Sequence, residues 1–506
     1  MKKVGFLFGA GAEISYGMPS GGKFSLDIFR QSTDEPKAKL KEMRDDVNEQ
    51  TGYAANWLPS DYQNKAIRAY TQRVYNSIIK DTINNNKVVI INRINNFDQL
   101  AQQVLDRVYT SDEEDAADIF DKEVQLDLNK SVGDINIKQS LRYNKLFDGG
   151  NQLFESSYMS IFLEYYQNYS FDNEEERELL GDLLKAIFQL HIGALSSEVS
   201  NRVEDSVFDK QNLDVDFFDD LGGSLNVNYE AAGITGLKLL SDKKIERMEN
   251  DIVKFVYFIV EQIYAEVLDY KTLIDSNWHY LYLPKTEWAK FTKISVFLYT
   301  VQNYIKEQAK NLDSRKAGYY SELRDEIEKS KLEVSVIATT NYSSFIREMV
   351  SKPVLFLNGG IDIFYDPYMN TLIDDLDKYR ERNKNNLHIV VPLLFTQSGT
   401  KPMTSIDMSE KYVEFYERLK ESDIICSVGF GFNPDDEHIN GVIRTLVERD
   451  NKQLYIVTYS KDSSSKLKKR YSENLKISKN GNIHIIKVDS NRIIEGTREK
   501  WYTRLE

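Results

Sequence analysis

The chain has 506 residues, of which 41% are hydrophobic and 12% aromatic, so it can bury a sizeable core, and global disorder is excluded. It carries 79 acidic and 65 basic residues, a net charge of -14, so its average surface repels a nucleic-acid duplex and direct nucleic-acid binding is not expected. A single cysteine, Cys426, excludes a disulfide framework and zinc sites built from cysteine pairs, and it fits a cytoplasmic protein. No stretch approaches the roughly 20 apolar residues that a bilayer span requires, so no membrane association is expected.

The expected elements begin with an apolar strand. Residues 4–8, VGFLF, form a continuous apolar run that is typical of a strand covered on both faces, and a glycine turn follows at once. Residues 31–330 are charged, tyrosine-rich and helical in pattern. The clearest amphipathic helix is predicted over residues 242–270, where apolar side chains recur every three or four positions, and further helices are predicted near residues 60–81, 96–109, 153–169 and 174–195.

The pattern changes after residue 331 to six short apolar runs separated by turn residues: VSVIAT, VLFLN, HIVVPLLF, DIICSVGF, QLYIVTY and IHIIKV. Such runs are typical of a parallel sheet with helical crossovers. The first strand and these six runs predict one α/β domain of residues 1–30 plus 331–506, interrupted by an all-α insertion of residues 31–330. The acidic segments 111–149 and 199–228 are expected to be connections.

Gly9, Ala10 and Gly11 follow the first strand at a point where a helix is expected to begin. Backbone N–H groups at such a turn point beyond the carboxyl end of the strand, where an anionic diphosphate is the natural occupant. Glycines here can equally mark a tight strand-to-helix turn, so these three residues alone leave both interpretations open.

The glycine turn is one of several motifs placed at the ends of expected strands or just beyond them. The others are GMP at residues 17–19, TTNY at 339–342, NGG at 358–360 and GFGF at 429–432. Together they resemble the sirtuin (silent information regulator) family, an NAD-dependent variant of the Rossmann-like dinucleotide-binding fold. The family's motifs are GAG followed by GIP, then TQNID and GTS, and its V-x-P-x-V-V-x-F strand is similar to the run at 390–395. The resemblance covers residues 1–30 and the region after residue 331.

The resemblance implies a sirtuin-like NAD-binding domain with NAD+ as the substrate and no metal. It implies catalytic roles for Asn341, in the TQNID-like motif, and for Asn358, at the position of the family's catalytic histidine. It implies that the ligand is bound by the matching positions and their neighbours: Gly9, Ala10, Gly11, Glu13, Gly17, Pro19, Thr339, Thr340, Gly429, Phe430, Gly431, Phe432 and His438.

Three departures from the family pattern bear on the activity. One cysteine cannot build the four-cysteine zinc ribbon of protein-deacylating sirtuins. The family's DFR is replaced by SGG at residues 20–22, and the serine of its GAGxS motif is replaced by Glu13. Asn358 replaces a histidine general base, a group that typically contributes about 10² to 10⁴ in rate. These departures argue against protein deacylation.

Hydrolysis of NAD+ demands less of the site than deacylation does. It requires that the ribose be oriented, that a water be positioned and that an oxocarbenium-like centre be stabilised. The Asn341 amide both donates and accepts, so it can bridge the ribose hydroxyls and a water. The segment GFGFNPDDEHIN at 429–440 resembles the G-[YF]-S-F-x-D-x-H-[IL]-N signature of sirtuin-like NAD hydrolases in bacterial anti-phage defence, which commonly carry a helical insertion.

Plain structural interpretations stand beside these roles. Asn341 and Asn358 both suit turns at strand ends. His388 and His438 are alternatives for a replacement base, although a lone histidine is more often structural. Asp435, Asp436, Glu437 and His438 contain metal-ligand types, but acidic residues at a helix N-terminus explain the run more simply.

The leading hypothesis is an NAD+ glycohydrolase that depletes NAD+ in infected bacterial cells as part of an abortive-infection system. Such an activity needs restraint, so the insertion is expected to mediate homo-oligomerisation or to sense a partner. The resemblance suggests a HerA-type ATPase or another phage-sensing protein as that partner. The alternative hypothesis is a module that binds NAD+ or ADP-ribose with little catalysis. A distant acid, Glu13, Asp362 or Asp366, is also a candidate base.

Overall fold

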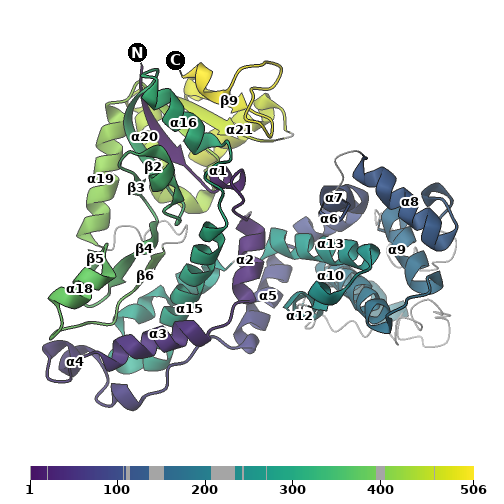
Figure 1. Cartoon of the computed structure of the whole chain (residues 1–506), viewed down its shortest axis with the longest axis horizontal. Helices are drawn as coiled ribbons and strands as arrows, with labels where there is room; N and C mark the ends of the chain where they lie inside the picture. The colour runs from purple at the N-terminus through teal and green to yellow at the C-terminus, as the bar shows by residue number, and fades with distance from the viewer. Residues whose placement is uncertain are drawn as a thin grey trace. The chain divides into compact units, whose positions relative to one another are not determined.

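The computed structural model describes residues 2–19, 21–105, 107–109, 114–135, 153–206, 234–241, 244–268, 270–394, 405–460 and 462–505. The chain forms two compact units. The sheet unit comprises Met1–Gly21, Gln31–Tyr70 and Tyr270–Glu506, and the helical unit comprises Gly22–Arg30 and Thr71–Asp269. Figure 1 shows both units and labels their elements.

A six-stranded parallel sheet is the centre of the sheet unit. Its strands lie in the order β3-β2-β1-β7-β8-β9, which is 3-2-1-4-5-6 when they are numbered along the chain. This is the strand order of Rossmann dinucleotide-binding folds. The α/β class and the parallel sheet are therefore confirmed. The strands are β1 (Lys3–Phe8), β2 (Glu333–Thr339), β3 (Leu355–Phe356), β7 (Ile424–Val428), β8 (Gln453–Thr458) and β9 (Ile483–Lys487).

One of the six apolar runs lies outside this sheet. The HIVVPLLF run contains β6 (Val391–Leu394), which pairs antiparallel with β4 (Gly359–Asp366), and β4 also pairs with β5 (Thr371–Ile373). The prediction that this run belongs to the parallel sheet is wrong, because a short, wholly buried apolar run looks the same in either kind of sheet. Its last residue, Phe395, lies outside the described residues.

Helices on the parallel sheet come from the crossovers between its strands. Helix α19 (Ile406–Lys420) packs against β1, β2 and β3, and α21 (Ser464–Leu475) packs against β9. The apolar side of α19 is buried through Met408, Tyr412, Phe415 and Leu419, which recur at three and four residues. The other helices that follow strands are α1 (Gly11–Ile14), α17 (Phe345–Val350), α18 (Leu376–Arg382), η9 (Pro434–Asp436), α20 (Glu437–Glu448), η10 (Asn480–Asn482) and η11 (Trp501–Arg504).

Helices from the middle of the chain complete the sheet unit. The long helix α15 (Pro284–Lys310) packs against β4, β6 and α3, and α16 (Tyr319–Glu328) leads directly into β2. Residues 31–70 and 270–330 therefore belong with the sheet, whereas the sequence interpretation assigned them to the insertion. Their amphipathic pattern could not show which partner their apolar faces cover. The remaining elements are α3 (Asp34–Asp45), α4 (Gly52–Trp57), η1 (Tyr62–Asn64), α14 (Lys271–Asn277) and η7 (Trp278–Tyr282).

The described residues of the helical unit contain helices and no strand. Helix α10 packs against α13, α6, α12 and α5, and α13 also packs against α7. The helices are α2 (Gly21–Phe29), α5 (Gln72–Asn85), α6 (Lys87–Asn95), α7 (Phe97–Leu105), α8 (Ala116–Leu128), η2 (Val132–Asp134), η5 (Leu153–Glu155), α9 (Ser157–Asn168), α10 (Glu174–Ser206), α12 (Ile234–Ser241), η6 (Lys244–Arg247) and α13 (Asp251–Val267). Helices are confirmed near 96–109, 153–169, 174–195 and 242–270, although α13 begins nine residues later than predicted. The helix predicted over 60–81 begins only at Gln72. The expectation that residues 111–149 form a connection is wrong for Ala116–Leu128, which forms α8, and α10 continues into the second expected connection, 199–228, as far as Ser206. The rest of these two segments lies largely outside the described residues.

A buried carboxylate ties α2 to the rest of the helical unit. The side chain of Glu261 on α13 is 4% exposed and pairs with Arg30 at 3.1 Å, Lys23 at 3.4 Å and Arg107 at 2.5 Å. Burial alone would raise the pKa of Glu261, but Lys23, Arg107 and Arg30 together lower it. The ionised carboxylate is therefore stabilised by three cations, two of which lie on or just after α2.

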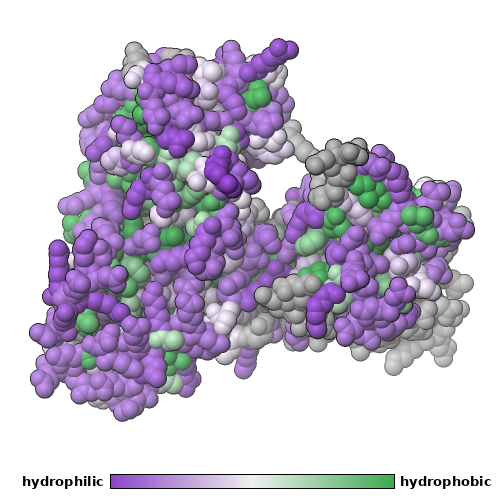
Figure 2. All heavy atoms as spheres, viewed as in Figure 1, coloured by the Kyte–Doolittle hydropathy of each residue, from purple (hydrophilic) through white to green (hydrophobic). Residues whose placement is uncertain are grey.

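The drawn face of each unit is mostly hydrophilic, with hydrophobic residues in small groups (Figure 2). Among the helices of the described residues, none has a segment long and apolar enough to cross a bilayer.

Candidate functional site

The expected motifs follow strands whose carboxyl ends are level with one another. In the register of the sheet, Phe8 at the end of β1 pairs with Thr339 at the end of β2 and with Val428 at the end of β7. Because β1 and β7 lie at the point where the strand order reverses, this edge is the position at which open α/β sheets bind their ligands.

The glycine turn packs backbone to backbone against the loop after β7. The N–H of Gly9 donates to Val428 O at 2.9 Å, and the N–H of Gly11 donates to Gly429 O at 3.0 Å. A Cβ on Gly9 would lie 2.7 Å from Gly429 O, and a Cβ on Gly429, whose φ is +65°, would lie 2.5 Å from the nitrogen of Ala12. Glycine is required at Gly9 and Gly429 because these two backbone segments approach each other so closely that a Cβ would clash.

This packing changes the expected role of the glycine turn. The N–H groups of Gly9 and Gly11 are bonded to the β7 loop, so they are not available to a diphosphate in this conformation. Helix α1 has only four residues and ends before Gly17, whose φ is +114°, and Pro19. Ala10 is exposed at its start. The turn therefore joins two strand ends, and the phosphate cradle predicted from its sequence is not formed by these two amides.

Asn341 lies at the same edge, immediately beyond β2. Its side chain is buried, and its Nδ2 donates to Gly9 O at 3.1 Å and to the hydroxyl of Tyr320 at 3.2 Å. Its backbone N–H donates to the Thr339 hydroxyl at 3.0 Å, and the N–H of Thr340 donates to Phe8 O at 3.0 Å. The structure thus brings Asn341 to the glycine turn, as the sequence motifs predict.

Glu13 belongs to the same cluster. Its carboxyl group is 1% exposed and accepts hydrogen bonds from the hydroxyls of Tyr320, at 3.1 Å, and Ser343, at 2.8 Å. Burial raises the pKa of Glu13 to about 7, while the hydrogen bonds from Ser343 and Tyr320 and the nearby amide of Asn341 act in the opposite direction. We call Glu13, Tyr320, Asn341 and Ser343 the Asn341 network.

Asn358 and His438 form a second group at this edge. Asn358 lies two residues beyond β3, and its Oδ1 is 3.4 Å from Nε2 of His438 in α20. Burial lowers the pKa of His438 to about 4, so its imidazole is neutral at pH 7, and within the described residues its Nδ1 has no hydrogen-bond partner. An imidazole thus lies beside Asn358, one of the two residues expected to be catalytic.

The DDEH run begins a helix, as its simpler interpretation predicts. Asp435 and Asp436 lie in η9, and α20 starts at Glu437. Asp436 is fully buried. The pKa of Tyr412 is raised mainly by the burial of its own hydroxyl and further by the charge of Asp436. The ring of Tyr412 lies 5.8 Å from that of His438. No cluster of three or more His, Cys, Asp or Glu side chains suited to a metal ion occurs in the part of the chain that the structure describes.

The β7 loop contributes packing more than exposed ligand contacts. Phe430 and Phe432 are 5% and 0% exposed, and their rings lie 4.9 Å apart. Phe432 has a φ of +49°, an unusual value for a bulky residue. Gly431 lies between the two phenylalanines. The loop is held by the packing of their rings and by the backbone contact of Gly429 with the glycine turn.

Of the three acids considered as bases, only Glu13 lies with Asn341. Asp362 is half-exposed, with its nearest cation, Lys306, 3.9 Å away. Asp366 is buried at the end of β4 and accepts from Nδ1 of His388 at 2.6 Å. His388 precedes β6 and is packed against Tyr53, with ring centroids 4.2 Å apart. These two acids and His388 belong to the antiparallel sheet and its surroundings.

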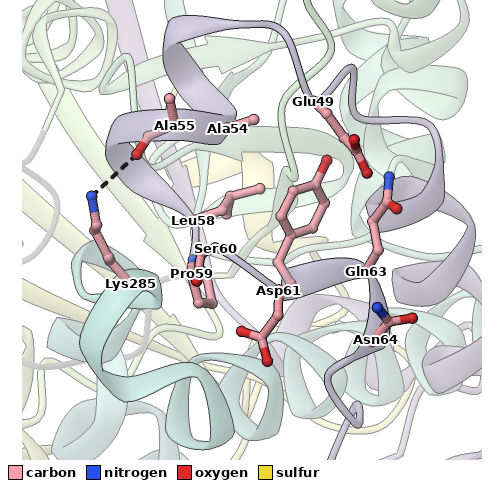
Figure 3. A pocket seen from close by; sticks show the side chains of 11 residues that line it. Glu49, Ala54, Ala55, Leu58, Pro59, Ser60, Asp61, Gln63, Asn64 and Lys285 are labelled. Atoms are coloured by element: carbon pink, nitrogen blue, oxygen red, sulfur yellow. Dashed lines mark hydrogen bonds between the residues drawn. The ribbon is translucent and has the colours of Figure 1, made fainter.

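A pocket of about 350 Å³ lies elsewhere in the sheet unit and contains none of the residues expected to bind NAD+ (Figure 3). The end of α4 and the chain through η1 line it, with Glu49 on one side and Lys285 on the other. The Lys285 ammonium already donates to the carbonyls of Ala55, at 3.1 Å, and Asn56, at 3.4 Å. It caps the C-terminus of α4 through these two carbonyls.

Sequence reasoning missed Tyr320, Ser343 and Tyr16. Tyr16 accepts from the backbone N–H groups of Tyr320, at 2.9 Å, and Ser321, at 3.0 Å, and so fixes the start of α16. Tyr320 lies in the stretch assigned to the insertion, where nothing in a tyrosine-rich helical pattern marks one hydroxyl as part of a site. Ser343 could have been found, because it lies two residues beyond Asn341 in the same motif.

Comparison of the chain with protein-family models, with curated proteins and with solved structures found no match.

Proposed function

We propose that the chain is an NAD+ glycohydrolase, which cleaves NAD+ to ADP-ribose and nicotinamide and acts as an NAD-depleting effector in bacterial anti-phage defence. The observation that carries the proposal is the meeting of three motif loops at the switch point of a sheet with Rossmann strand order. There Asn341 is bonded to Gly9, and Gly429 is bonded to Gly11. The sirtuin-like motifs supply the identity of the ligand.

Hydrolysis of NAD+ requires, at this edge, a group that accepts a hydrogen bond from a ribose hydroxyl or from water, and a base that takes up the released proton. The C1′–N bond to nicotinamide breaks, water adds to C1′, and one proton is released. Both amide protons of Asn341 are already donated within the protein, which leaves its Oδ1 to accept from a ribose hydroxyl or from water. His438, held neutral by burial, is the candidate proton acceptor.

The test is release of nicotinamide from NAD+ by the purified chain, followed by chromatography. We expect Asn341→Ala to lower the rate by about 100-fold or more, because the reacting sugar loses its orientation. Asn480→Ala is the matched control, since Asn480 is exposed in the same unit and should leave the rate unchanged. Equal rates for the two variants would refute the assignment of the site.

The second candidate function is a module that binds NAD+ or ADP-ribose and sets assembly without cleaving the ligand. Two observations favour it: Asn358 stands in place of the family's base, and a histidine with a pKa of about 4 is a weak proton acceptor. Ligand binding without nicotinamide release, even with an activating partner present, would support this function.

We propose a homo-oligomer in the cytoplasm as the working form. A HerA-type ATPase or another phage-sensing protein is the proposed partner, and the helical unit is the proposed place for that contact. These assignments rest on the resemblance to sirtuin-like defence proteins. Sedimentation of the purified chain, alone and with a co-expressed ATPase, tests both.

A further inference from the structure

A chain of hydrogen bonds runs from Asn341 to a carboxyl group that is closed off from solvent. Nδ2 of Asn341 donates to the Tyr320 hydroxyl at 3.2 Å, and this hydroxyl donates to Oε1 of Glu13 at 3.1 Å. The Ser343 hydroxyl lies 2.8 and 2.9 Å from the two carboxyl oxygens, so its one proton is shared between them. The carboxyl group is therefore two hydrogen bonds away from the side chain proposed to face the ribose.

The direction of each bond is fixed by chemistry. Gly9 O is a carbonyl and can only accept, so the Asn341 amide must present its nitrogen to it. The second amide proton then goes to Tyr320, whose own proton is left for Glu13. Reversing the amide would place two acceptors against each other at Gly9. The orientation of Asn341, with its oxygen away from the network, is therefore set by Gly9 O, and the bond to Tyr320, whose own proton goes to Glu13, restrains it further.

The middle member of the chain cannot move easily. Tyr320 is fully buried, its ring stacks on Tyr16 with centroids 5.4 Å apart, and its backbone N–H is bonded to the Tyr16 hydroxyl. Its ring also meets that of Phe8 edge to face at 5.1 Å. A change at Glu13 is consequently transmitted to Asn341 through a hydroxyl held in one place.

We propose that Glu13 and Tyr320 are positioning residues, which hold the Asn341 oxygen toward a hydroxyl of the bound ligand and make binding depend on the ionisation of one buried carboxyl group. This inference rests on the proposed NAD site. It assigns a use to the glutamate that replaces the serine of the family's GAGxS motif.

The surroundings of Glu13 favour a response near neutral pH. The groups that face it are Tyr320 from α16 and Ser343 and Asn341 from the segment after β2, and no ion pair to Glu13 occurs among the described residues. Burial raises its pKa to about 7. An ionised carboxylate is the stronger acceptor, so the chain of hydrogen bonds is tighter above this pH and looser below it.

The test is the affinity for ADP-ribose between pH 5.5 and 8.5, measured by calorimetry. ADP-ribose has no group that titrates in this range, and it is not consumed. We expect wild type to bind about 3- to 10-fold more tightly at pH 8.5 than at pH 5.5, and Glu13→Gln to bind equally at both, because its carbonyl accepts from Tyr320 without titrating. Tyr320→Phe should bind about 10-fold more weakly than wild type at pH 8.5 and lose the pH dependence.

Tyr319→Phe is the matched control. Tyr319 precedes Tyr320 on α16 and is also buried, but it packs against Trp501 and lies outside the Asn341 network. The affinity of Tyr319→Phe for ADP-ribose, and its dependence on pH, should therefore match those of wild type. Tryptophan fluorescence verifies that each variant is folded. If wild type and Asn341→Ala both fail to bind ADP-ribose, the proposed function fails and the inference with it. If Asn341→Ala weakens binding while Glu13→Gln and Tyr320→Phe retain the wild-type profile, the inference alone is overturned.

Discussion

The buried carboxyl group of Glu13 should make the stability of the sheet unit depend on pH in a way that one substitution removes. A carboxyl group whose pKa is raised in the folded state binds a proton more tightly there than in the unfolded chain. Its contribution to stability is full below the unfolded pKa of 4.5 and is lost as the pH rises to the folded pKa of about 7. We therefore expect wild type to lose stability across this window and Glu13→Gln not to lose this part.

The magnitude follows from the shift. A rise of about 2.5 pH units at 1.36 kcal/mol per unit corresponds to about 3 kcal/mol of unfolding free energy. Glu13 is 1% exposed, so solvent screening does not reduce this figure substantially. The difference between Glu13→Gln and wild type should grow by about 3 kcal/mol between pH 4.5 and pH 7 and stay constant above. Other titrating groups cancel in this difference, since both proteins contain them.

The chain offers a probe that reports on the correct unit. Its four tryptophans, Trp57, Trp278, Trp288 and Trp501, all lie in the sheet unit, so intrinsic fluorescence in urea follows that unit alone. The control is Glu307→Gln on α15, because the Glu307 side chain is 66% exposed and its loss should leave the pH dependence unchanged. Parallel stability curves for wild type and Glu13→Gln would refute the reasoning.

Two further predictions concern backbone contact and the helical unit. Gly429→Ala should lower the unfolding free energy of the sheet unit by about 2 to 5 kcal/mol, because the new Cβ would lie 2.5 Å from the nitrogen of Ala12 and residue 429 has a φ of +65°. Gly481→Ala is the control: a Cβ there has no atom within 4 Å and should change the unfolding free energy little. Tryptophan fluorescence in urea measures both variants. Glu261→Gln should lower the stability of the helical unit by about 1 to 3 kcal/mol at pH 7, with the difference shrinking as the pH falls through the lowered pKa of Glu261, as followed by circular dichroism. An unchanged denaturation midpoint in either variant would contradict the contacts described.

The strand order could be approached from sequence because buried parallel strands are short, continuous apolar runs. Five of the six runs after residue 331 join β1 in one sheet. The sixth does not, since Val391–Leu394 is buried on both faces in an antiparallel sheet and periodicity cannot distinguish the two cases. Turn residues mark where a strand stops but not which strand it pairs with.

The position of Asn341 beside the glycine turn follows from the same reasoning, because carboxyl ends of adjacent parallel strands meet at one edge. The occupation of the Gly9 and Gly11 amides does not, since it depends on how closely the β7 loop approaches. The part that Tyr320 plays in the site could not be predicted from the sequence either. A single hydroxyl in a helix far from any motif has no pattern of its own, and only the fold brings it to Glu13.

The order of segments along the chain limits how the helical unit can be produced by itself. The backbone passes between the two units four times, because Gly22–Arg30 belongs to the helices while Gln31–Tyr70 belongs to the sheet. A fragment of residues 71–269 would lack α2, and Glu261 would lose Lys23 and Arg30. Grafting α2 onto the front of that fragment through a short glycine-serine tether would restore both cations and yield a piece suited to expression on its own.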